Sequence, residues 1–142
     1  MNNAAKYLLT VASVTMVSAC AIHQKVTPVS NANGKSVCII ENKSVKDGFL
    51  STYRRTLEAK GYSVKLLDPS ASLNQCPMTS TYNASWRWDL ALYMSLAEIK
   101  VYSDGKIVGE AKYDSTRGGG NMGKFINAEG KINELVTQLY PI

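Results

Sequence analysis

The chain is poor in the residues from which hydrolytic and metal sites are built. Histidine occurs once in 142 residues, as His23, with no carboxylate or second histidine beside it in the sequence. Gly-x-Ser-x-Gly, His-Glu-x-x-His and Cys-x-x-Cys motifs are all missing. A solitary histidine of this kind is typically solvated rather than catalytic or metal-bound. The composition therefore predicts that the protein is not an enzyme and that it binds no metal.

Long hydrophobic runs are also missing, apart from one near the N-terminus. Lys6 precedes the apolar run YLLTVASVTMV, which is too short to cross a bilayer as a permanent helix and is typical of a secretion signal. The tetrapeptide VSAC (17–20) that follows resembles the lipobox of bacterial lipoproteins. This resemblance implies that residues 1–19 are removed and that Cys20 carries a lipid anchor. The alternative is an ordinary signal peptide with a chance cysteine.

The same resemblance implies a localisation. Ala21, and not an aspartate, follows Cys20, and this favours the outer over the inner membrane. Several acyl chains make such an attachment effectively permanent, because each buried methylene contributes about 0.8 kcal/mol. We expect the domain on the periplasmic side of the cell outer membrane, with that membrane as its first partner.

Charge of one sign is not concentrated anywhere in the chain. The 16 Lys and Arg residues exceed the 11 Asp and Glu residues by five, but they are scattered, without a run of the kind that nucleic-acid-binding proteins carry. We expect no nucleic-acid partner. A mildly basic surface suits anionic lipid or glycan, and it equally suits an ordinary solvated face.

Cysteine is scarce, and the three cysteines fall into two groups: one candidate for the lipid and one pair. With Cys20 occupied by lipid, Cys38 and Cys76 remain as an even pair in a compartment where disulfides persist. We predict that these two are bonded, which in the chain-entropy model stabilises the fold by roughly 4 kcal/mol. The alternative is two free thiols.

The mature chain is long enough for one domain and short for two. Residues 20–35 show no hydrophobic period and contain several small polar residues, which is typical of a flexible tether. We therefore expect a lipidated tether over 20–35 and a single globular domain over 36–142.

Two helices are expected in that domain. The first, near 45–60, has apolar residues at every fourth position, and Ser44 with Asp47 has the spacing of a capping box. The second, near 127–139, has Asn127 as its N-cap.

The remaining elements are expected to be strands. A tight turn near 89–92 and an Asp-Gly hairpin turn at 104–105 separate three of them. The order strand-helix-strand-strand-strand-strand-helix predicts an α+β fold, a mixed sheet with the helices on one face. The strands are expected near residues 36–41, 62–67, 81–88, 93–103 and 106–113.

The stretch RGGGNMGKF (117–125) fits two phosphate-binding patterns, Gly-x-Gly-x-x-Gly and Gly-x-x-x-x-Gly-Lys. A phosphate loop also needs Ser or Thr after its lysine and a helix that starts at once. Phe125 stands after Lys124, and the helical pattern begins only around Asn127. We therefore predict no nucleotide and no cofactor, and interpret the stretch as a loop leading to the C-terminal helix. A flexible lip of a partner site is the alternative.

Two tryptophans form the best candidate for a ligand surface. Trp86 and Trp88 share one face of the strand over 81–88, while Arg87 lies on the other face and Arg117 lies in the glycine-rich stretch. Such a face can stack sugar rings or contact lipid. Packing beneath the helices is the more usual role of tryptophans in a sheet.

Asp89 and Asp114 are the acids nearest these aromatic residues. A pair of carboxylates supports glycoside-type chemistry when the two groups face one cleft, roughly 5 to 10 Å apart. Catalysis by this pair therefore depends on the fold bringing the two together.

Several stretches together resemble a known family. VCIIEN, LNQCP, TYNASWRWDLALYM, AEIKVY, AKYDSTRGGG and KINELVTQLYP are similar to the Sbal-type family of small Gram-negative lipoproteins of unknown function, over about 37–141. WRWDLALYM and the pair Cys38 and Cys76 are the most specific parts. The resemblance implies a lipid-anchored periplasmic α+β domain, and it brings no established catalytic residue or cofactor.

From these observations we expect a non-catalytic interaction or structural module, held at the outer membrane and contacting an envelope protein or a glycan. The alternative is a glycan- or lipid-binding protein that uses the aromatic strand face around Trp86 and Trp88.

Overall fold

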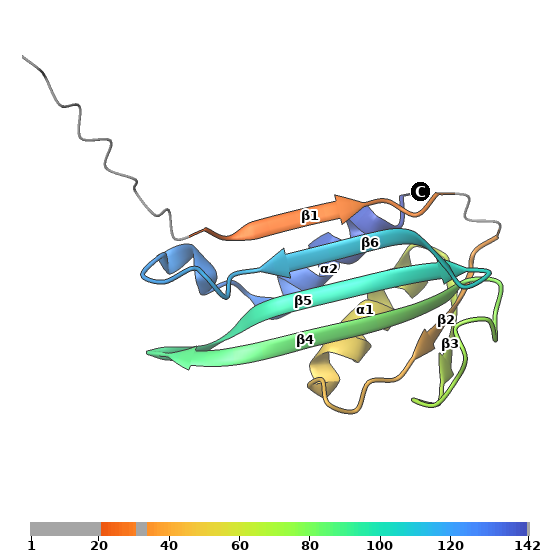
Figure 1. Ribbon diagram of the computed structural model, residues 1–142, viewed down its shortest axis with the longest axis horizontal. Coiled ribbons are helices and arrows are strands. Elements are labelled where there is room, and N and C mark those ends of the chain that lie inside the picture. The colour runs from red at the N-terminus through yellow and green to blue at the C-terminus, as the bar shows by residue number, and fades with distance from the viewer. Residues whose placement is uncertain (1–20, 31–33, 142) are drawn as a thin grey trace, which may run out of the picture.

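The computed structural model describes residues 21–30 and 34–141. They form a six-stranded mixed sheet in the order β1-β6-β5-β4-β2-β3, with two α-helices on one face (Figure 1). The predicted α+β class, mixed sheet and helical face are confirmed. The elements are β1 (His23–Thr27), β2 (Ser36–Ile40), α1 (Asp47–Ala59), β3 (Ser63–Leu67), β4 (Thr79–Asp89), β5 (Ala91–Ser103), β6 (Lys106–Asp114), the 3₁₀ helix η1 (Met122–Lys124) and α2 (Ala128–Leu139).

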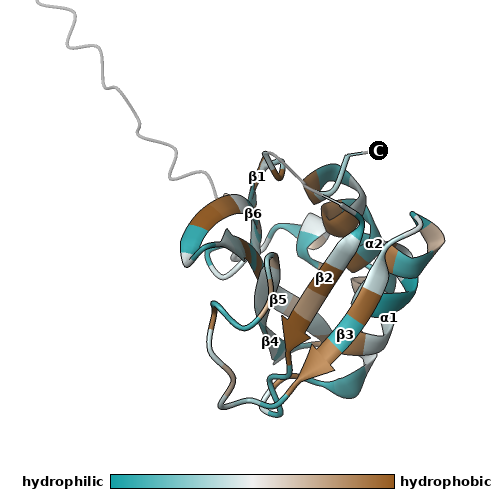
Figure 2. Cartoon of the chain, turned by 90° about the vertical axis from the view of Figure 1, so that its right-hand side faces the viewer, coloured by the Kyte–Doolittle hydropathy of each residue, from teal (hydrophilic) through white to brown (hydrophobic). Residues whose placement is uncertain are grey.

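Both helices bury the apolar stripe that their sequences predict. On α1 the stripe is Phe49, Tyr53 and Leu57, all fully buried, and on α2 it comprises Ile132, Leu135, Val136 and Leu139. Figure 2 shows apolar residues along β2 and β3 and polar residues over the outer surface of α1. The core therefore lies between the sheet and the helices.

The predicted capping box at the start of α1 is wrong. The N-cap position is taken by Lys46, which makes no side-chain capping bond. Ser44 instead donates its backbone N–H and its hydroxyl to Oδ1 of Asn42, at 3.1 and 2.6 Å. Local side-chain bonds of this kind compete with capping. Here they form a turn over residues 42–44, before the helix begins. At α2 the expected cap is present, because Oδ1 of Asn127 accepts from the N–H of Gly130 at 2.7 Å.

The crossover through α1 makes β2 and β3 parallel, as expected. The predicted disulfide is present: Cys38 on β2 is bonded to Cys76 in the loop that leads to β4, with the two Cα atoms 6.2 Å apart. The bond lies in a small second apolar cluster with Ile40 and Leu67. It thus fixes the long loop against the sheet.

Strands β4, β5 and β6 form an antiparallel meander with two tight turns. Leu90 forms the first turn with φ 62°, and Asp104 and Gly105 form the second with φ 50° and 73°. Both expected turns are confirmed. The Asp-Gly pair suits its turn because both central residues need positive φ.

The predicted tether over 20–35 is wrong for residues 23–30. β1 pairs antiparallel with β6, with His23 opposite Asp114 and Thr27 opposite Glu110. An edge strand gains stability from its backbone hydrogen bonds, which need no apolar alternation. The sequence pattern therefore missed this strand, and the sheet has six strands instead of the predicted five.

The chain beyond β1 is also fixed to the domain. The N–H of Val29 donates to the carbonyl of Leu139 at 2.8 Å, and the N–H of Ser30 donates to the carbonyl of Val108 at 3.0 Å. Val29 is buried against Gly109, where an added Cβ would lie only 2.8 Å from its Cγ2. The globular domain therefore begins close to residue 22, and not at residue 36.

Candidate functional site

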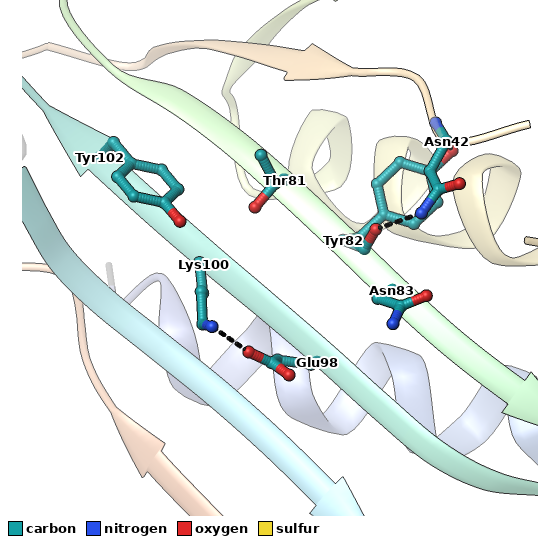
Figure 3. A pocket seen from close by; sticks show the side chains of 7 residues that line it. All are labelled: Asn42, Thr81, Tyr82, Asn83, Glu98, Lys100 and Tyr102. Carbon is teal, nitrogen blue, oxygen red and sulfur yellow. Dashed lines mark hydrogen bonds and ion pairs between the residues drawn. The ribbon is translucent and has the colours of Figure 1, made fainter. Parts of the chain in front are cut away.

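The sheet face opposite the helices carries a polar depression of about 420 Å³ (Figure 3). Its side chains come mainly from the outward-facing positions of β4 and β5, where Thr81 lies opposite Lys100 and Asn83 opposite Glu98. The depression is lined by Asn42, Thr81, Tyr82, Asn83, Glu98, Lys100 and Tyr102.

The charges in this depression compensate one another. Lys100 is bonded to Glu98 and lies 4.0 Å from Glu110. The hydrogen bond from Lys100 to Glu98 raises the pKa of this lysine above its usual value. Lys100 therefore stays protonated at neutral pH, where it acts as a hydrogen-bond donor and not as a nucleophile.

Asn42 forms the edge of the depression where β2 diverges from β4. Its Nδ2 donates to the carbonyl of Tyr82, and its backbone N–H donates to the hydroxyl of Tyr82, both at 3.1 Å. Burial raises the pKa of Tyr82. With hydroxyls, amides and the ring of Tyr102, the depression offers hydrogen bonds to a polar ligand.

The structure separates the two tryptophans that the sequence grouped together. Along their face of β4, Tyr82 and Ala84 are buried and Trp86 is half-buried against the core. The Nζ of Lys46 lies 5.3 Å from the Trp86 ring centroid. Trp88 is 74% exposed, because β4 has passed beyond the helices at this point. Only Trp88 therefore remains as an aromatic surface.

The two arginines of the candidate site lie close to the glycine-rich loop. Arg87 is exposed and donates from a terminal guanidinium nitrogen to the carbonyl of Thr116, at 3.2 Å. Arg117 is exposed in the next residue along that loop. The two place positive charge on one side of the β4–β5 hairpin.

Asp89 and Asp114 do not form a pair. In the sheet register Asp89 lies opposite Ala91 of β5 and Asp114 opposite Leu96, so five residues of strand, roughly 16 Å, separate their levels. Asp114 accepts from the N–H and hydroxyl of Thr116, and the hydroxyl bond is the main cause of its lowered pKa. The condition set for carboxylate catalysis is therefore not met.

The glycine-rich loop is folded back against the sheet. Its lysine, Lys124, is buried and is bonded to Asp89 and to the carbonyl of Gly119. A Cβ added at Gly118 would lie 2.9 Å from the carbonyl oxygen of Ser115. In a phosphate loop this lysine reaches toward the phosphates. Here the ammonium of Lys124 is already bonded to groups of the protein, and α2 begins only at Ala128. Both observations argue against a nucleotide site.

His23 is exposed on β1 and lies opposite Asp114 in the sheet register. Nothing in the sequence pattern pointed to this neighbour, because the two residues are brought together only by the pairing of β1 with β6. Within residues 21–30 and 34–141, no group of three or more His, Cys, Asp and Glu residues is arranged to hold a metal. None of the helices in these ranges combines the length and apolar character of a membrane span.

Sequence reasoning missed the apolar residues at the end of the β4–β5 hairpin. Leu90 is 83% exposed and Leu92 56%, and Met122 in the neighbouring η1 is 70% exposed. The signal was present in the sequence, since the predicted turn at 89–92 contains two leucines where polar residues are usual.

No protein-family model matches the chain, and no curated protein gives a significant match. Solved structures do match it. A dodecamer of a single-substitution variant of PelC from Paraburkholderia phytofirmans matches with a TM-score of 0.53 and 13% sequence identity, covering 84% of this chain and 94% of that one. A second PelC dodecamer from the same organism matches with a TM-score of 0.52 and 14% identity, over 84% and 95%. The domain therefore shares its fold with PelC.

Proposed function

We propose that the protein is an outer-membrane lipoprotein, anchored through Cys20, whose periplasmic domain acts as a non-catalytic interaction or structural module. The signal-like N-terminus with its lipobox supports the anchor. The disulfide between Cys38 and Cys76 supports an oxidising compartment.

One observation carries the proposal furthest. The ordered domain begins almost directly after Cys20: Ile22 is partly buried against the core, and β1 starts at His23. A lipid on Cys20 therefore leaves no spacer between membrane and domain. A domain held in this way acts on partners at the membrane surface and does not reach across the periplasm.

The non-catalytic part of the proposal rests on the charged groups of the candidate sites. Lys124 is bonded to Asp89, Asp114 is engaged by Thr116, and Lys100 is bonded to Glu98. Each of these groups is used to hold the fold, and a catalyst needs such a group aimed at a substrate.

A second copy of the chain is the first partner to test. The structural neighbours are dodecamers, and they share the fold over most of both chains. We propose that the anchored domain self-associates at the membrane. The mass of the detergent-extracted native protein, measured by light scattering with the detergent contribution subtracted, tests this.

The alternative function is ligand binding by the aromatic strand face, and the exposure of Trp88 favours keeping it. For a glycan, titration with soluble peptidoglycan fragments should change the fluorescence of Trp88. A Trp88→Phe variant, which retains Trp86, serves as the control.

Metabolic labelling with palmitate tests the anchor. We expect label on the wild-type protein and none on Cys20→Ser, together with loss of the variant from the outer-membrane fraction. Equal labelling of the two proteins would refute lipidation at Cys20. Crosslinking in intact cells then identifies the protein or glycan that the anchored domain contacts.

A further inference from the structure

The β4–β5 hairpin ends in an exposed apolar cluster. Trp88 and Leu92 lie opposite each other near its end and Leu90 lies in the turn, and we call these three residues the apolar tip. Two other large hydrophobic residues in the described ranges are strongly exposed. Met122 lies in η1, in the loop beside the hairpin, and Ile107 lies beside the hairpin turn at the opposite end of the sheet. Exposed apolar surface is thus concentrated at one end of the domain.

The apolar tip projects beyond the body of the sheet. β6 ends at Asp114, level with Leu96 of β5, while the β4–β5 hairpin continues for five more residues to Ala91, roughly 16 Å further. Figure 1 shows this hairpin reaching past the neighbouring strands at the end where β1 begins. The apolar tip therefore lies, with the loop that carries η1, at the outermost part of that end (Figure 1).

The anchored end of the chain lies at this same end. His23 pairs with Asp114, so β1 starts level with the point where the hairpin leaves the sheet. The side chain of Ile22 lies beside the loop: a Cβ added at Gly118 would lie 3.7 Å from its Cγ1, and one added at Gly123 would lie 3.5 Å from its Cδ1. Cys20 is three residues before His23, a span of at most about 10 Å. A lipid on Cys20 and the apolar tip therefore lie at the same end of the domain, where both can contact one membrane surface.

The apolar tip is held rigidly. Lys124 of η1 bonds to Asp89 of the hairpin, and the rings of Tyr93 and Phe125 meet edge-on with centroids 5.3 Å apart. These contacts join the hairpin to the loop that carries Met122. The apolar tip consequently keeps a defined position relative to that loop.

Leu90, the residue in the turn, indicates that an apolar side chain at this position contacts something outside the domain. Leu90 has a φ of 62°, a region that glycine and asparagine adopt at lower cost than leucine. It is also 83% exposed, so its side chain gains little from the fold. A residue that is unfavourable for both the turn and the solvent indicates a function outside the isolated domain.

We propose that the apolar tip inserts into the phospholipid surface to which Cys20 is anchored, as a second, non-covalent membrane contact that fixes the orientation of the domain. The proposal rests on the anchor proposed above. Tryptophan with its polar N–H is favoured at such interfaces, and leucine enters the acyl region. Arg87 adjoins Trp88 and bonds to the carbonyl of Thr116, the residue before Arg117, so both arginines lie near the hairpin end, where they can meet phosphate headgroups. The apolar character of Leu90 and Leu92 favours lipid over a hydrated glycan.

Tryptophan fluorescence tests the contact, because the two tryptophans can be observed one at a time. The mature lipoprotein is extracted from its own envelope and reconstituted in vesicles of phosphatidylethanolamine and phosphatidylglycerol with brominated acyl chains. In Trp86→Phe, where Trp88 remains, we expect strong quenching by the bromines. In Trp88→Phe, where Trp86 remains, we expect little. Equal quenching of the two variants, or none of Trp88, would overturn the proposal.

A second pair of variants separates the membrane contact from folding. Leu90→Asn, in the Trp86→Phe background, should raise the urea midpoint because it relieves the positive φ, and it should lower the quenching of Trp88 severalfold. Ile107→Thr removes an exposed aliphatic side chain at the opposite end and should leave the quenching unchanged. Quenching that persists fully in Leu90→Asn would contradict insertion of the apolar tip.

The two proposals fail in different ways. Without a lipid on Cys20, the protein takes up no palmitate and does not float with the vesicles. If the protein floats with the vesicles and Trp88 stays unquenched, the anchor stands and insertion of the apolar tip is wrong.

Discussion

The buried ammonium of Lys124 is bonded to the carboxylate of Asp89, and this pair joins the glycine-rich loop to the end of the β4–β5 hairpin. The bond explains why the loop, despite its glycines, is not an open cradle for phosphate. It also explains how a long hairpin that leaves the sheet keeps a defined position.

Removing the acidic partner should therefore destabilise the domain. In Asp89→Asn the buried ammonium loses its charged partner and keeps the carbonyl of Gly119 as an acceptor. Because Asp89 is half-exposed, we expect a loss of about 1–2 kcal/mol, less than for a fully buried pair. Urea unfolding measures this, and adding Lys124→Met should recover part of the loss. An unchanged midpoint in Asp89→Asn would contradict the structural role of the pair.

The disulfide should contribute a large share of the stability. Cys38 and Cys76 are 38 positions apart, so in the chain-entropy model their bond stabilises the fold by about 4 kcal/mol. We expect the midpoint of urea unfolding to fall strongly when reductant is present. The double variant Cys38→Ala and Cys76→Ala should show the same low midpoint with or without reductant. A wild-type midpoint that is indifferent to reductant would argue that the bond is not formed.

Loss of the hydroxyl should change the stability of the domain differently at two buried tyrosines. The Tyr53 hydroxyl lies 2.7 Å from both the Ser80 and the Tyr140 hydroxyl, whereas that of Tyr113 has no hydrogen-bond partner among the described residues. Tyr53→Phe should destabilise by about 1 kcal/mol, and Tyr113→Phe should be neutral or slightly stabilising. Chemical unfolding of the two variants side by side measures the difference, and equal losses would count against it.

Stability should fall at alkaline pH. Burial raises the pKa of Tyr53 and of Tyr140 above the ordinary value of 10.0. Above that value the unfolded chain releases these protons while the folded domain retains them, so the stabilisation is complete below pH 10.0 and is lost as pH rises. Each tyrosine adds about 1.4 kcal/mol per pH unit to the fall in the free energy of unfolding. Urea titrations from about pH 8 to about pH 11 should therefore give a shallower fall for Tyr140→Phe, and identical slopes would exclude this origin.

The close approach at Gly109 gives a test of the N-terminal segment. An alanine Cβ there would meet the backbone of Val29, with its Cα at 3.0 Å and its nitrogen at 3.1 Å. Gly109→Ala should cost about 1–3 kcal/mol and speed amide exchange in β1. Gly120→Ala, where no atom lies within 4 Å of the added Cβ, should change neither. If residues 21–30 were a free tether, the two variants would behave alike.

The sequence predicts those parts of this fold that rest on side-chain pattern. The stripe on α1 and the Asp-Gly turn at 104–105 are such features, and both are present. β1 rests instead on backbone bonds to β6, which leave little trace in the sequence, and so the pattern over residues 20–35 predicts a tether.

The candidate site shows a second limit. Trp86 and Trp88 are equivalent in the strand pattern, yet Trp86 packs beside the first turns of α1 and α2 while Trp88 lies past both helices. Alternation assigns a face to a residue, but it does not say where the covering layer ends. The exposure of Trp88 could only come from the three-dimensional arrangement.

The two ends of the chain meet in the finished domain. Gln24 donates to Glu134 at 2.7 Å across 110 positions of sequence, and Val29 bonds to Leu139. The first strand pairs with β6, but its contacts with α2 require the last residues of the chain. A truncation of the last helical turns should accordingly loosen residues 24–29 at the far end of the sequence, although β1 keeps its pairing with β6.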